Sequence, residues 1–245
     1  MTFCLGIAVQ DGLIGIADTR ITTGMEMSSS RKLITRQFDN NALFLMTSGL
    51  RSTRDKAVMY FDEYLNDEGR TFDKLHKAVS AYCGFVRQVA DEDQSSLSRS
   101  GLFFDLHTLI GGQFEKDETH KLYLVYPQGN WVEILTDTPF CIIGRSAYGK
   151  PLLDRMLTYP TSLEHALNIG FLAFDSTCTS VTEVDFPIDI ALYRSGSFAI
   201  SEHRFAQNEL QEASEWWHTR LSELVKDVPS NWAKKFFSKS EAAHS

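Results

Sequence analysis

The sequence has few cysteines, and their spacing excludes the functions that depend on paired thiols. The 245 residues include four, at Cys4, Cys83, Cys141 and Cys178, each among apolar or small neighbours. Scattered thiols of this kind are typical of reduced core residues, so we expect neither disulfides nor a zinc site. The seven His residues form no HExxH motif, and the GxSxG, P-loop and GxGxxG motifs are missing too. The sequence therefore implies no metal and no cofactor.

Positive charge is also scarce, and long apolar runs are missing. The net charge of −8 argues against nucleic acid and anionic membranes as partners. No apolar run approaches the roughly 18–20 residues of a membrane span. The N-terminus lacks the basic and apolar regions of a secretory signal. We therefore expect a cytoplasmic protein that contacts neither nucleic acid nor membrane.

The residues that are present form strand-like and helix-like segments in a regular order. Two β-hairpins are predicted in the first 50 residues, with an Asp-Gly turn in the first and an Asp-Asn-Asn turn in the second. Helical spacing follows in 52–65 and 71–89, whereas the polar stretch 90–101 reads as an exposed loop. Strand signals then return, and a second helix pair includes a capping-box spacing from Thr161 to Glu164.

This order of elements predicts the fold class. Pairs of strands alternate with pairs of helices, and the chain ends with two strands and a last helix. A doubly wound parallel fold would need single strands alternating with single helices. We therefore expect an α+β fold, a four-layer α-β-β-α sandwich of two antiparallel sheets. Residues 1–245 are interpreted as one domain, with 206–245 as a C-terminal helix and tail.

Four residues with reactive potential fall at strand ends or at the chain start: Thr2, Asp18, Lys32 and Gly49. Removal of the initiator Met would leave Thr2 with a hydroxyl and a free amine of pKa about 7.7–8.0, which is suited to act as a general base. A buried Lys32 held by Asp18 would favour the alkoxide. The Gly49 N–H would stabilise an oxyanion. Taken alone, each residue also has an ordinary structural explanation.

Together these residues resemble the proteasome β-subunit family of N-terminal nucleophile hydrolases, and most of all the bacterial Anbu (ancestral β-subunit) proteins. The pattern that carries the resemblance consists of Thr2, Ala17-Asp18-Thr19-Arg20, Lys32, Ser48-Gly49 and Asp55. The segments Ile143–Pro151 and Phe174–Thr177 point the same way. The resemblance implies the sandwich fold, a threonine nucleophile without a cofactor, and a ring or helical homo-oligomer.

Two stretches depart from the family pattern. Proteasome subunits commonly carry an Asp followed three residues later by Ser and Gly, and this pair supports the Thr amine. Here the third residue after Asp175 is Cys178, and no Gly follows it. We therefore expect Ser180, two residues further on, to take the place of the missing serine. The Gly-Ser-Gly of many subunits appears as Gly144-Arg145-Ser146.

The sequence thus predicts a threonine-type peptidase whose candidate site residues are Thr2, Asp18, Lys32, Gly49, Asp175 and Ser180. Two alternatives stay open. The departures from the pattern also suit a non-catalytic or narrowly specialised assembly subunit of the same fold. An amidase that acts on small molecules would use the same nucleophile.

Overall fold

The structure is a computed structural model in which residues 2–23, 26–66 and 72–237 are described. The strands and helices run in the order β1 (Phe3–Val9), β2 (Gly12–Asp18), β3 (Arg20–Thr23), β4 (Glu26–Ser29), β5 (Leu33–Phe38), β6 (Asn41–Ser48), α1 (Arg51–Asn66), α2 (Leu75–Arg99), β7 (His107–Gln113), β8 (Lys121–Val125), β9 (Trp131–Glu133), β10 (Phe140–Gly144), α3 (Lys150–Met156), α4 (Leu163–Ser180), β11 (Ile188–Arg194), β12 (Ile200–Phe205), α5 (Gln207–Leu224), η1 (Val225–Asp227) and α6 (Lys234–Phe237).

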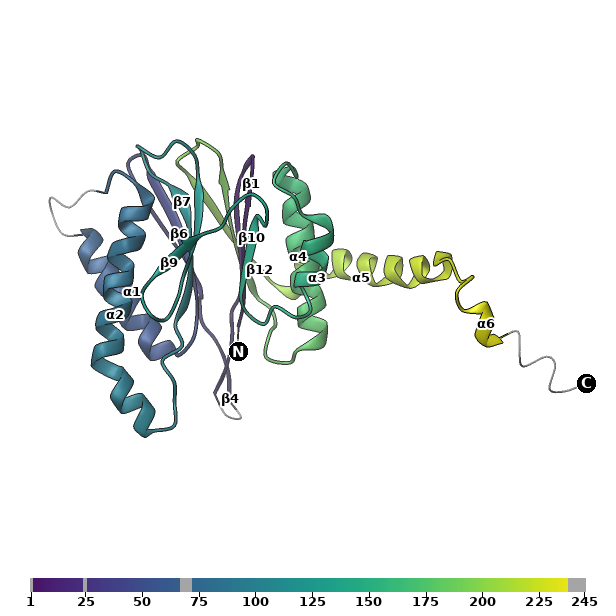
Figure 1. Cartoon of the computed structure of the whole chain (residues 1–245), viewed down its shortest axis with the longest axis horizontal. Coiled ribbons are helices and arrows are strands. Elements are labelled where there is room, and N and C mark those ends of the chain that lie inside the picture. Colours follow the sequence, from purple (N-terminus) through teal and green to yellow (C-terminus); the bar gives the residue numbers. More distant parts are fainter. Residues whose placement is uncertain (1, 24–25, 67–71, 238–245) are drawn as a thin grey trace, which may run out of the picture. The chain divides into compact units, whose positions relative to one another are not determined.

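Two five-stranded antiparallel sheets form the centre of the molecule. One has the order β10-β1-β2-β11-β12 and the other the order β5-β6-β7-β8-β9. Figure 1 shows the sheets face to face, with α1 and α2 outside one and α3 and α4 outside the other. The predicted α+β, four-layer sandwich is therefore confirmed.

Burial explains why the first hairpin forms the middle of its sheet. Every residue of β1 and β2 is buried. A strand that is apolar on both faces must be covered on both, here by the second sheet and by α4. On the helix side, the Phe3 ring on β1 packs edge-on against Phe174 of α4 at 5.9 Å between centroids. On the far side of the sandwich, Phe61 of α1 and Tyr82 of α2 pack in the same way at 5.4 Å.

Two of the local predictions were wrong. The stretch 90–101, expected as a loop, continues α2 as far as Arg99. Its acidic side chains lie on the helix surface, where Glu92 and Asp93 pair with Lys56 of α1 at 2.7 and 2.9 Å. The cap of α4 is Ser162, whose hydroxyl accepts from the His165 N–H at 3.3 Å, so the expected capping box starts one residue too early.

The chain divides into two compact units, 1–207 and 208–245. In the second unit, no described residue of α5 is buried. No described helix in either unit is long and apolar enough to cross a membrane.

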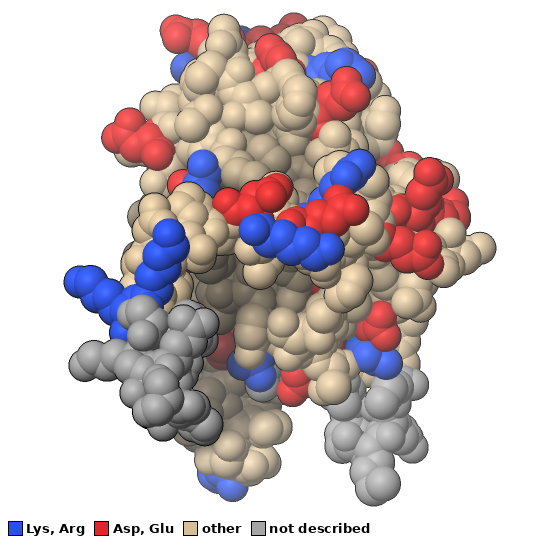
Figure 2. Space-filling view, turned by 90° about the vertical axis from the view of Figure 1, so that its right-hand side faces the viewer, with Lys and Arg blue, Asp and Glu red and all other residues tan. Residues whose placement is uncertain are grey.

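Charged side chains on the surface are largely arranged in pairs of opposite sign. Figure 2 shows one face on which acidic and basic side chains are interspersed. An example on α3 is Lys150, which contacts Asp154 at 2.7 Å with both side chains about half exposed. Exposed pairs of this kind contribute little to stability, typically about 0.3–0.5 kcal/mol for an i,i+4 helix pair.

One buried histidine links the two sheets. His120 is 7% exposed, and its Nε2 lies 2.8 Å from the Val9 carbonyl oxygen. Because a carbonyl only accepts, Nε2 carries the hydrogen, and the neutral ring accepts at Nδ1 from the Ser195 hydroxyl at 3.3 Å. Burial lowers the pKa of His120 below its ordinary value of 6.5.

The lowered pKa of His120 predicts a loss of stability in mild acid. In the unfolded chain the imidazole binds its proton at a higher pH than in the fold. The free energy of unfolding should therefore decrease as the pH falls below about 6.5 and level off below the folded pKa. The measurement is urea unfolding of the wild-type protein and of His120→Gln across this pH range. The variant keeps a donor for the Val9 carbonyl oxygen but cannot titrate, so its free energy of unfolding should depend less on pH. Parallel profiles would contradict the assignment.

Candidate active site

The centre of the candidate site is a buried ion pair between Lys32 and Asp18. The Lys32 Nζ lies 2.8 Å from both carboxylate oxygens of Asp18. The side chains are 4% and 0% exposed. Asp18 ends β2 and Lys32 directly precedes β5, so the pair joins the two sheets. A third hydrogen bond, from the Phe3 N–H to Asp18 Oδ1 at 2.8 Å, links the pair to the start of β1.

Two opposing effects act on the pKa of Asp18. Burial raises the pKa of Asp18, whereas the Lys32 ammonium and the Phe3 N–H both favour the ionised carboxylate. Replacing a buried ion pair by well-packed apolar residues is often neutral or stabilising. Stability alone therefore gives little reason for this pair, and a chemical role becomes the better explanation.

Thr2 lies at the start of this central strand and is itself buried, at 8% exposure. Its carbonyl oxygen accepts from the Arg145 N–H at 2.8 Å. The neighbouring Gly144 has φ +89°, and a Cβ there would lie 2.0 Å from the Thr2 carbonyl oxygen. Only glycine permits this approach, so the end of β10 fixes the backbone of Thr2. Thr2 is thus connected to the Lys32–Asp18 pair through the next residue, because the Phe3 N–H donates to Asp18.

Gly49 follows β6, close to Lys32. Two residues earlier, the Thr47 N–H donates to the Lys32 carbonyl oxygen at 3.2 Å. Gly49 has φ +139°, and a Cβ there would lie 2.2 Å from the Asp105 carbonyl oxygen. The backbone therefore requires glycine for steric reasons, and its use as an oxyanion donor stays a prediction.

The two site residues expected on α4, Asp175 and Ser180, differ in burial. Asp175 is half-buried and follows Phe174, whose ring packs on Phe3 next to Thr2. Ser180 is the exposed last residue of α4, and its side chain forms no hydrogen bond with any described residue. The intervening Cys178 donates its thiol to Asp185 at 3.5 Å. The described contacts thus link α4 to the chain start through Phe174, the neighbour of Asp175, and give no link from the Ser180 side chain.

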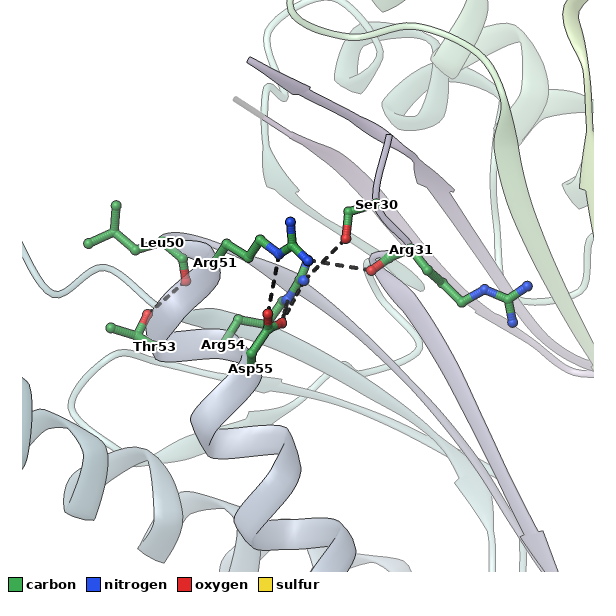
Figure 3. Close-up of polar contacts among 7 residues, drawn as sticks. All are labelled: Ser30, Arg31, Leu50, Arg51, Thr53, Arg54 and Asp55. Atoms are coloured by element: carbon green, nitrogen blue, oxygen red, sulfur yellow. Dashed lines mark hydrogen bonds and ion pairs between the residues drawn. The ribbon is translucent and has the colours of Figure 1, made fainter. Parts of the chain in front are cut away.

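A group that sequence reasoning missed connects the segments that carry Lys32 and Gly49. Arg54, in the first turns of α1, is 8% exposed. Its guanidinium donates to the Ser30 hydroxyl at 3.3 Å and to the Arg31 carbonyl oxygen at 3.4 Å, while Asp55 binds it at 2.6 Å (Figure 3). The sequence signal was the charged pair Arg54-Asp55 five and six residues after Gly49, and the structure shows that Arg54 is the buried member of the pair.

Arg54 should therefore act as a positioning residue for Lys32. In Arg54→Lys, a single ammonium replaces the planar fork and loses the simultaneous contacts with Ser30 and Arg31. We expect reaction of Thr2 with an electrophile to slow by about tenfold, measured well below the unfolding temperature. Arg51→Lys is the matched control, since Arg51 is 63% exposed and makes one contact, to Asp55 at 3.3 Å. Equal rates in both variants would contradict this role.

The described residues contain no group of three or more His, Cys, Asp or Glu side chains placed to hold a metal ion. The four cysteines are free thiols.

A four-layer sandwich of two antiparallel sheets between helix pairs is the N-terminal nucleophile hydrolase fold of the proteasome subunits. A sequence model of the family described as "Proteasome subunit" matches residues 2–187. The chain belongs to the proteasome subunit family. The chain is similar to proteasome subunit beta 1 of Pyrobaculum aerophilum, with 25% identity over 174 residues that cover 71% of this chain and 80% of the relative.

Solved structures of bacterial Anbu proteins are also similar. The Anbu complex of Pseudomonas aeruginosa, described as a helical assembly, is 28% identical with a TM-score of 0.87 over 93% of this chain and 97% of that one. Anbu of Yersinia bercovieri is 28% identical with a TM-score of 0.85 over the same shares. Anbu of Hyphomicrobium sp. strain MC1 is 27% identical with a TM-score of 0.83, covering 92% and 97%. The resemblance noted in the sequence is confirmed.

Proposed function

We propose that this chain is a threonine-type N-terminal nucleophile hydrolase that cleaves peptide or amide bonds and works as a homo-oligomer in the cytoplasm. The observation that carries the proposal is the buried Lys32–Asp18 pair, bonded to the backbone next to Thr2. Family membership supports the fold and the class of chemistry.

The proposed reaction begins after removal of Met1, which small second residues such as Thr favour. The Thr2 Oγ attacks the substrate carbonyl while the α-amine of Thr2 accepts the hydroxyl proton. The ammonium of Lys32 favours the developing alkoxide, and the Gly49 N–H donates to the oxyanion. The α-ammonium then gives its proton to the leaving amine, which leaves an ester on Thr2. Water hydrolyses this ester and restores the free hydroxyl. Asp175 supports the amine in this scheme, and Ser180 is a weaker candidate for the same role.

The test combines N-terminal processing with labelling of the nucleophile. Intact mass should show loss of Met1, and a β-lactone should add one acyl group to Thr2. The Thr2→Ala variant is the control, because Ala is also small enough for Met1 removal but offers no hydroxyl. We expect labelling and peptide hydrolysis to fall by at least about 10³-fold in this variant. Equal turnover by Thr2→Ala would exclude the nucleophile role.

One observation favours a second candidate function, a non-catalytic or specialised assembly subunit. The exposed Ser180 and the Cys178–Asp185 contact leave the family's Asp–Ser support of the amine incomplete. An assembled, processed protein that no threonine-directed electrophile labels would favour this candidate. A small-molecule amidase would be distinguished by a panel of peptide and non-peptide amides.

A further inference from the structure

An arginine stands beside the proposed nucleophile, and the proposed reaction does not use it. The backbone N–H of Arg145 donates to the Thr2 carbonyl oxygen at 2.8 Å, so the two residues are direct neighbours at the end of β10. The Arg145 side chain is 39% exposed and is therefore open to a ligand from solvent. Its Nε is nevertheless buried and forms no hydrogen bond with any described residue. A buried donor without a partner is uncommon in proteins and calls for an explanation, such as an ion that binds there.

The guanidinium lies at the end of the sheet where β1 begins. Its Nη2 is 3.8 Å from Oε1 of Glu183, which belongs to the connection between α4 and β11. Strands β10 and β11 are not neighbours, because β1 and β2 lie between them. The register shows that β10 ends at the same end of the sheet where β1 and β11 begin. The contact between Arg145 and Glu183 therefore lies at the end of the sheet that also holds Thr2.

This contact leaves most of the binding capacity of the guanidinium unused. At 3.8 Å the two groups attract each other as an ion pair but are too far apart for a hydrogen bond. A guanidinium carries five N–H donors, and a well-placed carboxylate accepts from two of them at once. Among the described residues, no carboxylate binds Arg145 in this way. A carboxylate on a substrate would therefore gain hydrogen bonds that Glu183 does not form.

A second arginine at this end of the sheet has closer partners. Arg20 of β3 contacts Asp185 at 3.0 Å and donates to the Thr182 carbonyl oxygen. Both partners lie in the connection that also carries Glu183. Arg20 thus holds this connection in place, whereas Arg145 retains the capacity to bind a further anion.

We propose that Arg145 binds a carboxylate of the substrate close to the scissile bond, so that the site prefers anionic peptides or amides. The proposal rests on the threonine peptidase function proposed above and narrows its substrate class. The carboxylate can come from an acidic side chain or from the free C-terminus of a short peptide, since both present the same planar group to the guanidinium. Glu183 would compete for Arg145 and give way when the substrate binds.

Pairs of peptides that differ only in one charge test the preference. One pair carries Glu or Gln at the residue whose carbonyl is attacked, and the other ends in a free carboxylate or in its amide. We expect the carboxylate member of one pair to have a kcat/KM at least about tenfold above that of its neutral partner, because charge-assisted hydrogen bonds are the strong ones. The pair that shows the preference identifies the source of the carboxylate. Equal values within both pairs would overturn the proposal.

Three variants assign the preference to its residue. Arg145→Gln should lower the ratio of the two kcat/KM values by about tenfold, chiefly through KM, because the charge and the planar fork are lost. Glu183→Gln should raise the ratio, because the competing carboxylate is removed. Arg155→Gln is the matched control, since it removes the same charge from an exposed residue of α3. An unchanged ratio in Arg145→Gln, an equal fall in Arg155→Gln, or a fall in Glu183→Gln would contradict the proposal.

Labelling of Thr2 by a neutral β-lactone separates this inference from the proposed function. The probe carries no carboxylate, so it reports on the nucleophile alone. A wild-type protein that is labelled but does not prefer anionic substrates would refute the role of Arg145 and leave the peptidase proposal standing. A wild-type protein that is not labelled would refute both.

Discussion

Lys32→Met is expected to lose at least about 10³-fold in the rate of Thr2 labelling and about 3–5 kcal/mol of stability. Stability falls because the variant leaves the carboxylate of Asp18 buried without its counter-ion, and labelling falls because the ammonium that favours the alkoxide is removed. The surface control Lys150→Met removes an exposed pair with Asp154 and should change stability by less than about 0.5 kcal/mol. Urea unfolding and β-lactone labelling measure the two effects separately.

The double variant, Lys32→Met with Asp18→Asn, separates the structural part from the chemical part. The amide introduced at position 18 still accepts from the Phe3 N–H, and no buried charge remains. Stability should therefore recover in large part while labelling stays lost. Recovery of both would mean that the ion pair serves the fold alone, and an unchanged labelling rate in the single variant would remove Lys32 from the proposed mechanism.

Gly144→Ala is the second substitution with a large expected effect. The new Cβ would meet the Thr2 carbonyl oxygen and displace the residue that carries the nucleophile. Because displacement of a reacting group by about 1 Å can cost 10²-fold, we expect labelling to fall at least that far. The positive φ adds strain of about 1–3 kcal/mol.

The control for this variant isolates the clash from the strain. Gly196 has φ +70°, and a Cβ there meets nothing within 4 Å. Gly196→Ala should therefore lose a similar amount of stability from strain and retain normal labelling. If the two variants label at the same rate, the Thr2–Gly144 contact does not position the nucleophile.

The fold was largely predictable because its signals are local. Turn residues and apolar runs define the hairpins, and their order with the helix pairs defines the four layers. The stretch 90–101 was misread because its polar composition suits a loop, and only the contact of Glu92 and Asp93 with Lys56 of α1 shows why it is helical. The strands β3 and β4, which lie between the two predicted hairpins, were not predicted.

The site was predictable only in part, since some of its contacts join distant segments. Asp18 and Lys32 fall at strand ends and form the expected pair. The role proposed for Arg54 depends on the Ser30 hydroxyl and the Arg31 carbonyl oxygen, more than 20 residues earlier, which no local pattern reveals. Ser180 was chosen as a substitute for the serine missing at position 178, whereas its exposure depends on where α4 ends.

The position of β1 between β10 and β2 has a practical consequence for preparing this protein. The strand that starts at Phe3 is paired on both edges and covered on both faces, and Thr2 at its start is buried. An affinity tag fused ahead of Thr2 would occupy this space and convert the amine into an amide. Under the proposed mechanism, material purified that way would be inactive because the amine that serves as base is blocked.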